Sequence, residues 1–158
     1  MAILEGLGPK RKVFEDLEPG DYLFEIAEPG EKGWTNLYEN EDNPGATMSF
    51  IQWRLRVLQP DQFEGKPFFH STMYDASPEQ IAMAKKPYDP AGFTYQFFAS
   101  IGAGIMDNGE VTLFDDYLTD GYPDLDKMIG LRFWGSVRKG VNKKQPDRVG
   151  LDKIWMED

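Results

Sequence analysis

Residues 48–58 read MSFIQWRLRVL, which is the clearest strand pattern in the chain. Large apolar residues alternate with polar or basic ones along this stretch, and a period of two is that of a β-strand with one buried and one exposed face. We expect one face to enter the core, comprising Ile51, Trp53, Leu55 and Val57. The other face is expected to be exposed, comprising Phe50, Gln52, Arg54 and Arg56.

Four more strands are expected around this one. Residues 21–28 lie between two Pro-Gly pairs. Residues 67–74 follow a turn and are expected to form a hairpin with the strand at 48–58. Residues 131–138 and 148–155 form the last two. The sequence favours core positions for four aromatic residues, Tyr22, Phe24, Phe69 and Phe133. On 67–74 the orientation stays open: either Phe68, His70 and Tyr74 face outward, or Phe69 and Met73 do.

The remaining segments are predicted to be an arm, a long loop and an insert. Residues 1–19 form a polar arm and residues 29–46 a long loop. In the insert at 77–130, Ser77 and Pro78 start a helix that runs to residue 86. A second helix is expected at 91–101, followed by an acidic, irregular stretch with a short helix at 125–129.

This order of elements predicts a mainly β protein of a single domain, residues 1–158. The expected architecture is a five-stranded OB-fold-like barrel with a helical insert between strands 3 and 4. Such a barrel binds oligonucleotides on the face of strands 2 and 3 and with the 1–2 and 4–5 loops. Here those loops are residues 29–46 and 139–148.

The composition narrows the function. There is no cysteine and one histidine among 158 residues, so disulfides, thiolate zinc sites and cysteine nucleophiles are excluded. No residue set supports catalysis, and we expect a non-enzyme without a cofactor. No apolar run spans a membrane and no signal peptide is found, which predicts a cytoplasmic protein, in the host cytoplasm if a phage encodes it.

The charge is strongly segregated. The net charge is −10, from 27 acidic and 17 basic residues. Ten acids and one base lie in 14–45, and seven acids and no base in 107–126. Residues 131–155 carry seven bases and two acids, a local +5. Such asymmetry favours a surface that faces a polyanion, although solvated loops of different sign would also produce it.

Single-stranded nucleic acid is bound by cations that pair with phosphates and by rings that stack on bases. We predict that binding involves the exposed face of 48–58, the 29–46 loop, the exposed face of 131–138 and the 139–148 loop. The candidate residues are Phe50, Arg54, Arg56, Trp34, Tyr38, Arg132, Trp134, Arg138, Lys139, Lys143, Lys144 and Arg148. Alternatively, Trp134 packs under the insert, and Trp34 or Tyr38 only anchors the loop.

The acidic stretch 107–126 does not predict a metal site. Aligning Gly121 with the glycine of a calcium-binding EF-hand loop places Leu118 at a ligand position and Lys127 where a glutamate is required. The acids also show no spacing that would bring them together around two catalytic metals.

Three short motifs resemble a known family. They are PGDY at 19–22, WRLRVL at 53–58 followed by FEGK at 63–66, and MIGLRF at 128–133 before the basic hairpin. Together they resemble phage-encoded OB-fold single-stranded-DNA-binding proteins. The resemblance implies sequence-tolerant coating of single-stranded DNA in phage replication or recombination, with phage replication or recombination proteins as partners and no membrane. The long acidic insert and the negative net charge depart from the family.

Other functions stay open. The chain could be a protein-interaction or assembly module, such as a virion component, on a similar β-barrel. It could be a small metal-dependent nuclease that uses 107–126, or an acidic mimic of nucleic acid that presents 14–45. The oligomeric state is not indicated by the sequence.

Overall fold

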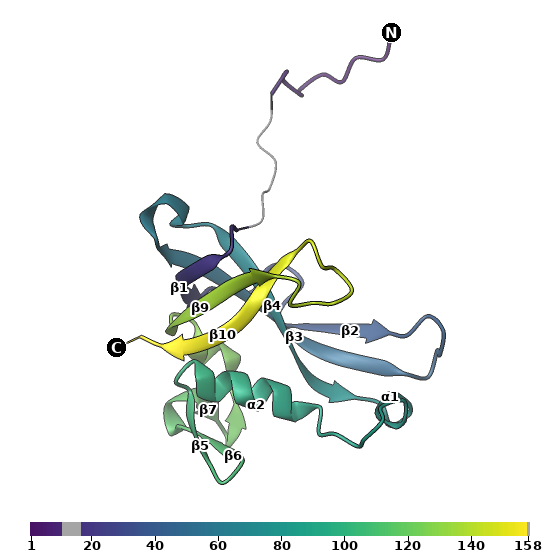
Figure 1. Cartoon of the computed structure of the whole chain (residues 1–158), viewed down its shortest axis with the longest axis vertical. Helices are drawn as coiled ribbons and strands as arrows, with labels where there is room; N and C mark the ends of the chain where they lie inside the picture. The colour runs from purple at the N-terminus through teal and green to yellow at the C-terminus, as the bar shows by residue number, and fades with distance from the viewer. Residues whose placement is uncertain (11–16, 158) are drawn as a thin grey trace.

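A computed structural model of the chain describes residues 1–10 and 17–157, and it is built mainly from antiparallel β-strands (Figure 1). The main sheet has the order β10-β9-β1-β3-β2, and β4 pairs with the other edge of β3. Its strands are β1 (Gly20–Ile26), β2 (Thr35–Glu39), β3 (Thr47–Gln59), β4 (Pro67–Ala76), β9 (Arg132–Lys139) and β10 (Val149–Met156).

The long strand β3 organises this sheet. One edge pairs with β1 through its C-terminal part and with β2 through its N-terminal part, while the other edge pairs with β4. The predicted alternation is confirmed, because Ile51, Trp53, Leu55 and Val57 are buried while Arg54 and Arg56 are exposed. The strand predicted at residues 48–58 is therefore the centre of the main sheet.

The sheet does not close into a barrel. In the part of the chain that the structure describes, β4 and β10 form no ladder with each other, although their pairing would close the sheet. The predicted mainly β class is observed, whereas the five-stranded closed barrel is not confirmed. The opening between β4 and β10, here called the seam, lies above helix α2 in Figure 1.

The insert contains more regular structure than the sequence predicted. Its elements are α1 (Pro78–Ala82), α2 (Ala91–Ser100), β5 (Gly104–Asp107), β6 (Glu110–Leu113), η2 (Asp115–Tyr117), β7 (Leu118–Thr119), β8 (Tyr122–Pro123) and η3 (Leu125–Met128). A further short 3-10 helix, η1 (Asp61–Phe63), lies outside the insert, in the turn between β3 and β4. Ser77 caps α1 as predicted, accepting a hydrogen bond from the Gln80 amide. The helix ends at Ala82 rather than at residue 86.

Strand β2, the β5–β6 hairpin and the short β7–β8 pair lie where the sequence predicted loops or irregular structure. The 29–46 loop contains β2, whose side chains are all exposed, so no apolar alternation marks it. The β5–β6 hairpin turns at Asn108 and Gly109, both with positive φ. Asn-Gly is a strong signal for a two-residue hairpin turn, and it was overlooked in this acidic stretch.

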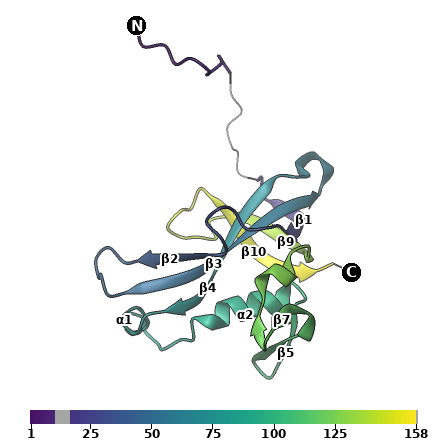
Figure 2. The same cartoon turned by 180° about the vertical axis from the view of Figure 1, so that it is seen from behind.

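The core is aromatic and joins the sheet to α2. Trp53 is fully buried, its ring centroid 4.7 Å from that of Phe97 and 6.1 Å from that of Phe98. Its indole N–H donates to the Thr72 hydroxyl (2.9 Å), which lies 2.8 Å from the Thr94 hydroxyl. This buried chain links β3, β4 and α2, which packs along β4 as Figures 1 and 2 show.

The predicted core positions of Tyr22, Phe24 and Phe133 are confirmed, but that of Phe69 is wrong, since its side chain is 68% exposed. The predicted arm at 1–19 is observed in part. Residues 1–10 are exposed and outside any helix or strand, residues 11–16 lie outside the described residues, and Leu17 is buried in the core. Among the described helices, none is long and apolar enough to cross a membrane.

Candidate nucleic-acid interface

The outer surface of the β3–β4 hairpin carries both rings and cations. The register places Arg54 opposite Phe69, Gln52 opposite Ser71 and Phe50 opposite Met73. These six residues form one patch, here called the β3–β4 face. Directly opposed side chains on neighbouring strands are within contact distance of each other. The face therefore carries a basic residue, Arg54, directly across from an exposed phenylalanine, Phe69.

The same register settles the orientation of residues 67–74. Phe68, His70 and Thr72 pair with Leu55, Trp53 and Ile51, so they point inward with these core residues. Phe69 and Met73 point outward, so the second of the two orientations considered for residues 67–74 is the observed one. Alternation alone could not decide between Phe68 and Phe69, because either of the adjacent rings could have been the buried one.

Three of the predicted arginines are paired with carboxylates. Arg56 bonds Glu25 (2.8 Å), Arg132 bonds Glu157 (2.7 Å) and Arg138 lies 3.4 Å from Asp152. Because Glu25 lies opposite both Arg56 and Arg132 in the ladders, a row of alternating charge crosses the outer surface of the sheet. With Glu157, the partner of Arg132, counted in, the row carries no net charge. For Arg54, in contrast, no ion pair is found within the described residues.

Trp134 lies on a different part of the outer surface, on β9. It does not pack under the insert but lies parallel to Trp155 of β10, with ring centroids 6.4 Å apart. Trp155 was not among the predicted residues, because strict alternation would place it on the inner side with Leu151. A β-bulge at Asp152 shifts the alternation, so that Lys153 and Trp155 face outward.

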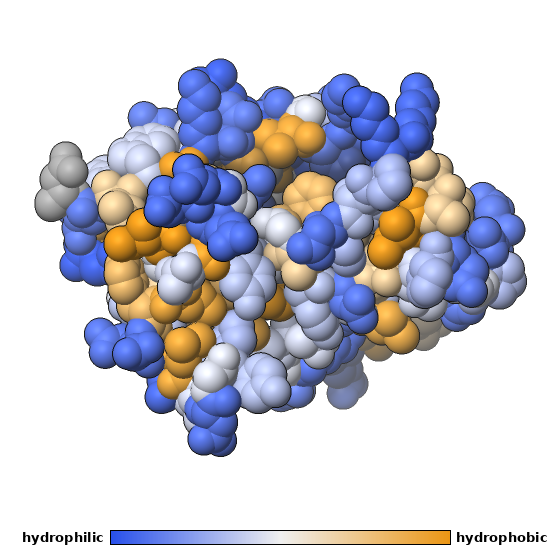
Figure 3. Space-filling view, turned by 90° about the horizontal axis from the view of Figure 1, so that it is seen from below, coloured by the Kyte–Doolittle hydropathy of each residue, from blue (hydrophilic) through white to orange (hydrophobic). Residues whose placement is uncertain are grey.

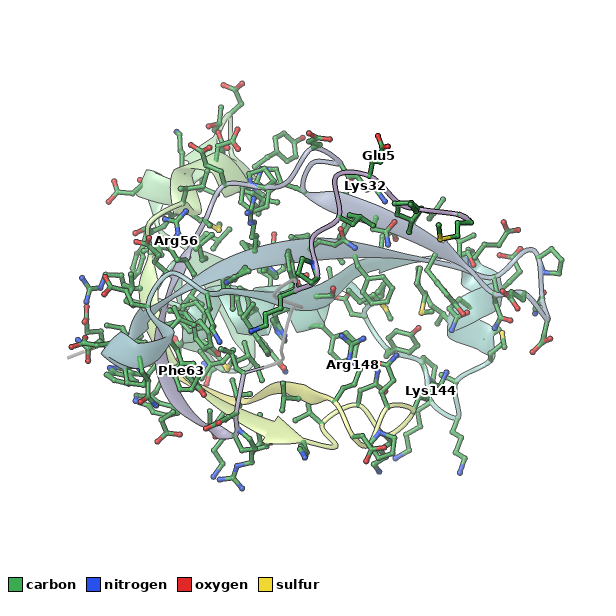
Figure 4. The ribbon with its side chains drawn as sticks, turned by 90° about the horizontal axis from the view of Figure 1, so that it is seen from above. Glu5, Lys32, Arg56, Phe63, Lys144 and Arg148 are labelled. Carbon is green, nitrogen blue, oxygen red and sulfur yellow. The ribbon has the colours of Figure 1, made fainter. Side chains whose placement is uncertain are left out.

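The β9–β10 loop, residues 140–148, is exposed along its whole length. Turns hold it together, with the Lys144 amide bonded to the Asn142 side chain (3.0 Å) and the Gly140 amide to the Arg148 carbonyl (3.1 Å). Figure 4 shows Lys144 and Arg148 on one side of the β3–β4 hairpin and Lys32 on the other. Lys139, Lys143 and Lys144 make no ion pair within the described residues.

The two aromatic residues predicted from the 29–46 loop differ in their placement. Trp34 is half-buried, packs edge-on against Trp53 and donates its indole N–H to Asp126 (2.9 Å). It therefore anchors the loop to the core and to the insert. Tyr38 is exposed on β2, at the edge of the sheet.

A cleft of about 410 Å³ occupies the seam. We call it the seam cleft. Its walls come from β3, β4, α2 and β10, and its lining residues are Phe50, His70, Ser71, Thr72, Met73, Phe93, Gln96, Phe97, Ser100, Leu151, Asp152 and Ile154. Because Phe50, Ser71 and Met73 also belong to the β3–β4 face, the cleft and that face are continuous.

His70 forms part of the wall of this cleft, its ring 5.2 Å from that of Phe97. Burial lowers the pKa of His70 to about 4, so the ring is uncharged at neutral pH. In the unfolded chain a histidine takes up its proton at about pH 6.5, before the folded protein does. Acidification between these two values therefore favours unfolding.

We expect the free energy of unfolding to fall by about 2–3 kcal/mol between pH 7 and pH 4 through this group alone. Urea titrations of the wild type and of His70→Gln across this range would measure it. The variant should lose stability less steeply as the pH falls. Parallel pH profiles for the two proteins would contradict an uncharged His70 in the folded protein.

The acidic part of the insert is held by its own hydrogen bonds. Asp124 accepts from the Thr119 hydroxyl (2.7 Å) and from the Asp126 amide, and the Thr119 bond in particular lowers the pKa of this carboxyl. Among residues 1–10 and 17–157, no three histidine, aspartate or glutamate side chains gather in a way that could hold a metal ion.

Comparison with known proteins adds no identification, since no protein-family model matches this chain and no curated protein gives a significant match to it.

Proposed function

We propose that the protein binds single-stranded DNA without catalysis and with little sequence preference. The observation that carries this proposal is the pairing of Arg54 with an exposed Phe69 on the β3–β4 face. A base can stack on the ring while the guanidinium pairs with a neighbouring phosphate, which is how single strands are bound without sequence readout. Folding alone gives no reason to expose a phenylalanine there.

The charges around this face support the same function. Lys139, Lys143, Lys144 and Arg148 form a basic loop next to β10 on an otherwise acidic protein. The ion pairs of Arg56, Arg132 and Arg138 are exposed, and exposed pairs contribute only about 0–1 kcal/mol. A phosphate can therefore take the place of the carboxylate at modest cost.

The architecture we propose is a partly open OB-type barrel, with β1, β3, β4, β9 and β10 as its five strands and α2 between the third and fourth. In that fold the strand 2–3 face binds the nucleic acid, and this corresponds to the β3–β4 face. The biological role we propose, from the family resemblance, is the coating of single strands during phage replication or recombination.

Fluorescence anisotropy with a labelled oligo-dT of about 30 nucleotides tests this function, because a strand of that length covers at least one typical binding site. We expect dissociation constants that rise with salt and weaker binding to a duplex of equal length. The logarithm of the affinity should fall linearly with the logarithm of the salt concentration, at about 0.7 per phosphate contact. No binding at low salt would refute the proposal.

A protein-interaction module is the second candidate, and a separate observation favours it. Apolar side chains gather at the end of the molecule that carries β5 and β6, as Figure 3 shows. Ile105, Met106 and Phe114 are exposed there. Exposed apolar clusters of this kind often mark protein contacts, and this one lies in the insert, outside the β3–β4 face.

A further inference from the structure

The seam cleft combines ring surfaces with hydrogen-bonding groups. Phe50, Phe93 and Phe97 supply aromatic surface from β3 and α2, together with the uncharged ring of His70. Ser71, Gln96, Ser100 and Asp152 supply polar atoms. Sites for small planar ligands have this make-up, a mostly apolar lining with a few polar groups that set the orientation.

Phe93 and Gln96 are the two lining residues best placed to contact a ligand. They lie three residues apart on α2, so they share one face of the helix. Both are exposed, and Phe93 is 52% exposed despite its size. The Gln96 side chain makes no hydrogen bond within the described residues, which leaves two donors and an acceptor for a ligand.

The charge of the lining selects which part of a nucleotide can enter. Among the residues that the structure describes, no lysine or arginine lines the cleft, and Asp152 is its only charged lining residue, since His70 is neutral. A phosphate inside would have no cation to pair with, and burying an unpaired charge is costly. An uncharged base suits this lining, with its phosphate left at the rim near Arg138, which pairs with Asp152.

The volume agrees with a single base. The cleft of about 410 Å³ is at the small end of ligand sites and is too small for a helix or a folded segment of a partner. The cleft is continuous with the β3–β4 face through Phe50, Ser71 and Met73. A single-stranded DNA that lies on that face can therefore place one base in the cleft.

We propose that the seam cleft receives one unstacked base of the bound single strand, with Phe93 stacking on it and Gln96 bonding its edge. This inference rests on the proposed function. A glutamine amide matches the N6 and N7 atoms of adenine with two hydrogen bonds. The site therefore gives a measurable preference for adenine to an interface that otherwise binds single strands of any base sequence.

The test compares dissociation constants of the full-length protein for dA, dT and dC homopolymers of equal length. We expect Phe93→Ala to weaken all three about fivefold or more, through lost stacking. Gln96→Ala should lower the affinity for dA relative to dT by about fivefold or more. Phe69→Ala, on the β3–β4 face, is the control for Gln96→Ala, because it should weaken binding to all three equally and leave the ratio of dA to dT affinity unchanged. Stacking within the oligonucleotides cancels, because the same strands are used for every variant.

Two results would overturn the base site while leaving the proposed function intact. In the first, the wild type binds single-stranded DNA, and the Phe93→Ala and Gln96→Ala variants bind each of the three homopolymers with the same affinity as the wild type. The second is tight binding of a free mononucleotide, dAMP, that is sensitive to the same two substitutions, since the cleft would then serve free nucleotides. Absence of strand binding by the wild type would refute both proposals.

Discussion

Phe69→Ala should weaken binding to single-stranded DNA about tenfold or more, without loss of stability. The ring is 68% exposed, so its removal leaves no cavity in the core. Base–aromatic stacking contributes about 1–3 kcal/mol per base, and about 1.4 kcal/mol corresponds to a tenfold change in affinity. Anisotropy titrations at one fixed salt concentration would measure the change.

Arg54→Ala on the opposing strand separates the contribution of charge from that of stacking. It should reduce the slope of affinity against salt by about 0.7, because one phosphate contact is lost. Phe69→Ala should leave this slope unchanged. Different effects of the two substitutions would show that the ring and the guanidinium contact different parts of the strand.

Two exposed residues on the insert serve as matched controls. Tyr122→Ala removes a ring that is 74% exposed on β8, and Lys86→Ala removes an exposed charge after α1. Neither lies on the β3–β4 face, and both variants should bind like the wild type. Equal losses in the control variants and in the Phe69 and Arg54 variants would mean that binding is not centred on the β3–β4 face.

Trp53→Ala should cost about 3–5 kcal/mol of the free energy of unfolding, a large share of what a domain of this size has. The indole is fully buried between the sheet and α2, where it contacts Trp34, Phe97 and Phe98. Its loss creates a cavity and leaves the Thr72 hydroxyl without its indole partner. Chemical denaturation followed by circular dichroism would measure the effect.

Trp155→Ala is the control with the same change of side chain. Trp155 is 40% exposed and lies on the outer surface beside Trp134, so we expect a loss below about 1 kcal/mol. Trp53→Phe keeps a ring but loses the hydrogen bond to Thr72, and it should fall between the two. Similar stabilities for Trp53→Ala and Trp155→Ala would contradict the central role of Trp53 in the core.

Much of the fold could be predicted because its strands are amphipathic. The predicted strands at 21–28, 48–58, 67–74, 131–138 and 148–155 each match an observed strand to within two residues at either end. The Ser77 cap was likewise readable from local chemistry. β2 escaped prediction because it is held by backbone pairing to β3 and buries none of its side chains.

The candidate site was less predictable, since its members depend on register. The outward direction of Arg54, Arg56, Arg132 and Arg138 followed from alternation and was observed. The pairing of Arg56, Arg132 and Arg138 with Glu25, Glu157 and Asp152 was not predicted, because these partners come from other strands or lie beyond a bulge. Trp34 proved to be an anchor for the same reason, since its partners Trp53 and Asp126 are distant in sequence.

The positions of most strands and the buried face of β3 could be read from the amino-acid sequence, since a period of two is a local property of the chain. The exposure of Phe69, the stacking of Trp155 on Trp134 and the cleft between β4 and β10 become visible only in the folded chain. Each of these depends on strand register, on a bulge or on a missing pairing. All three arise between segments far apart in the chain, where a shift of one residue exchanges the two faces of a strand.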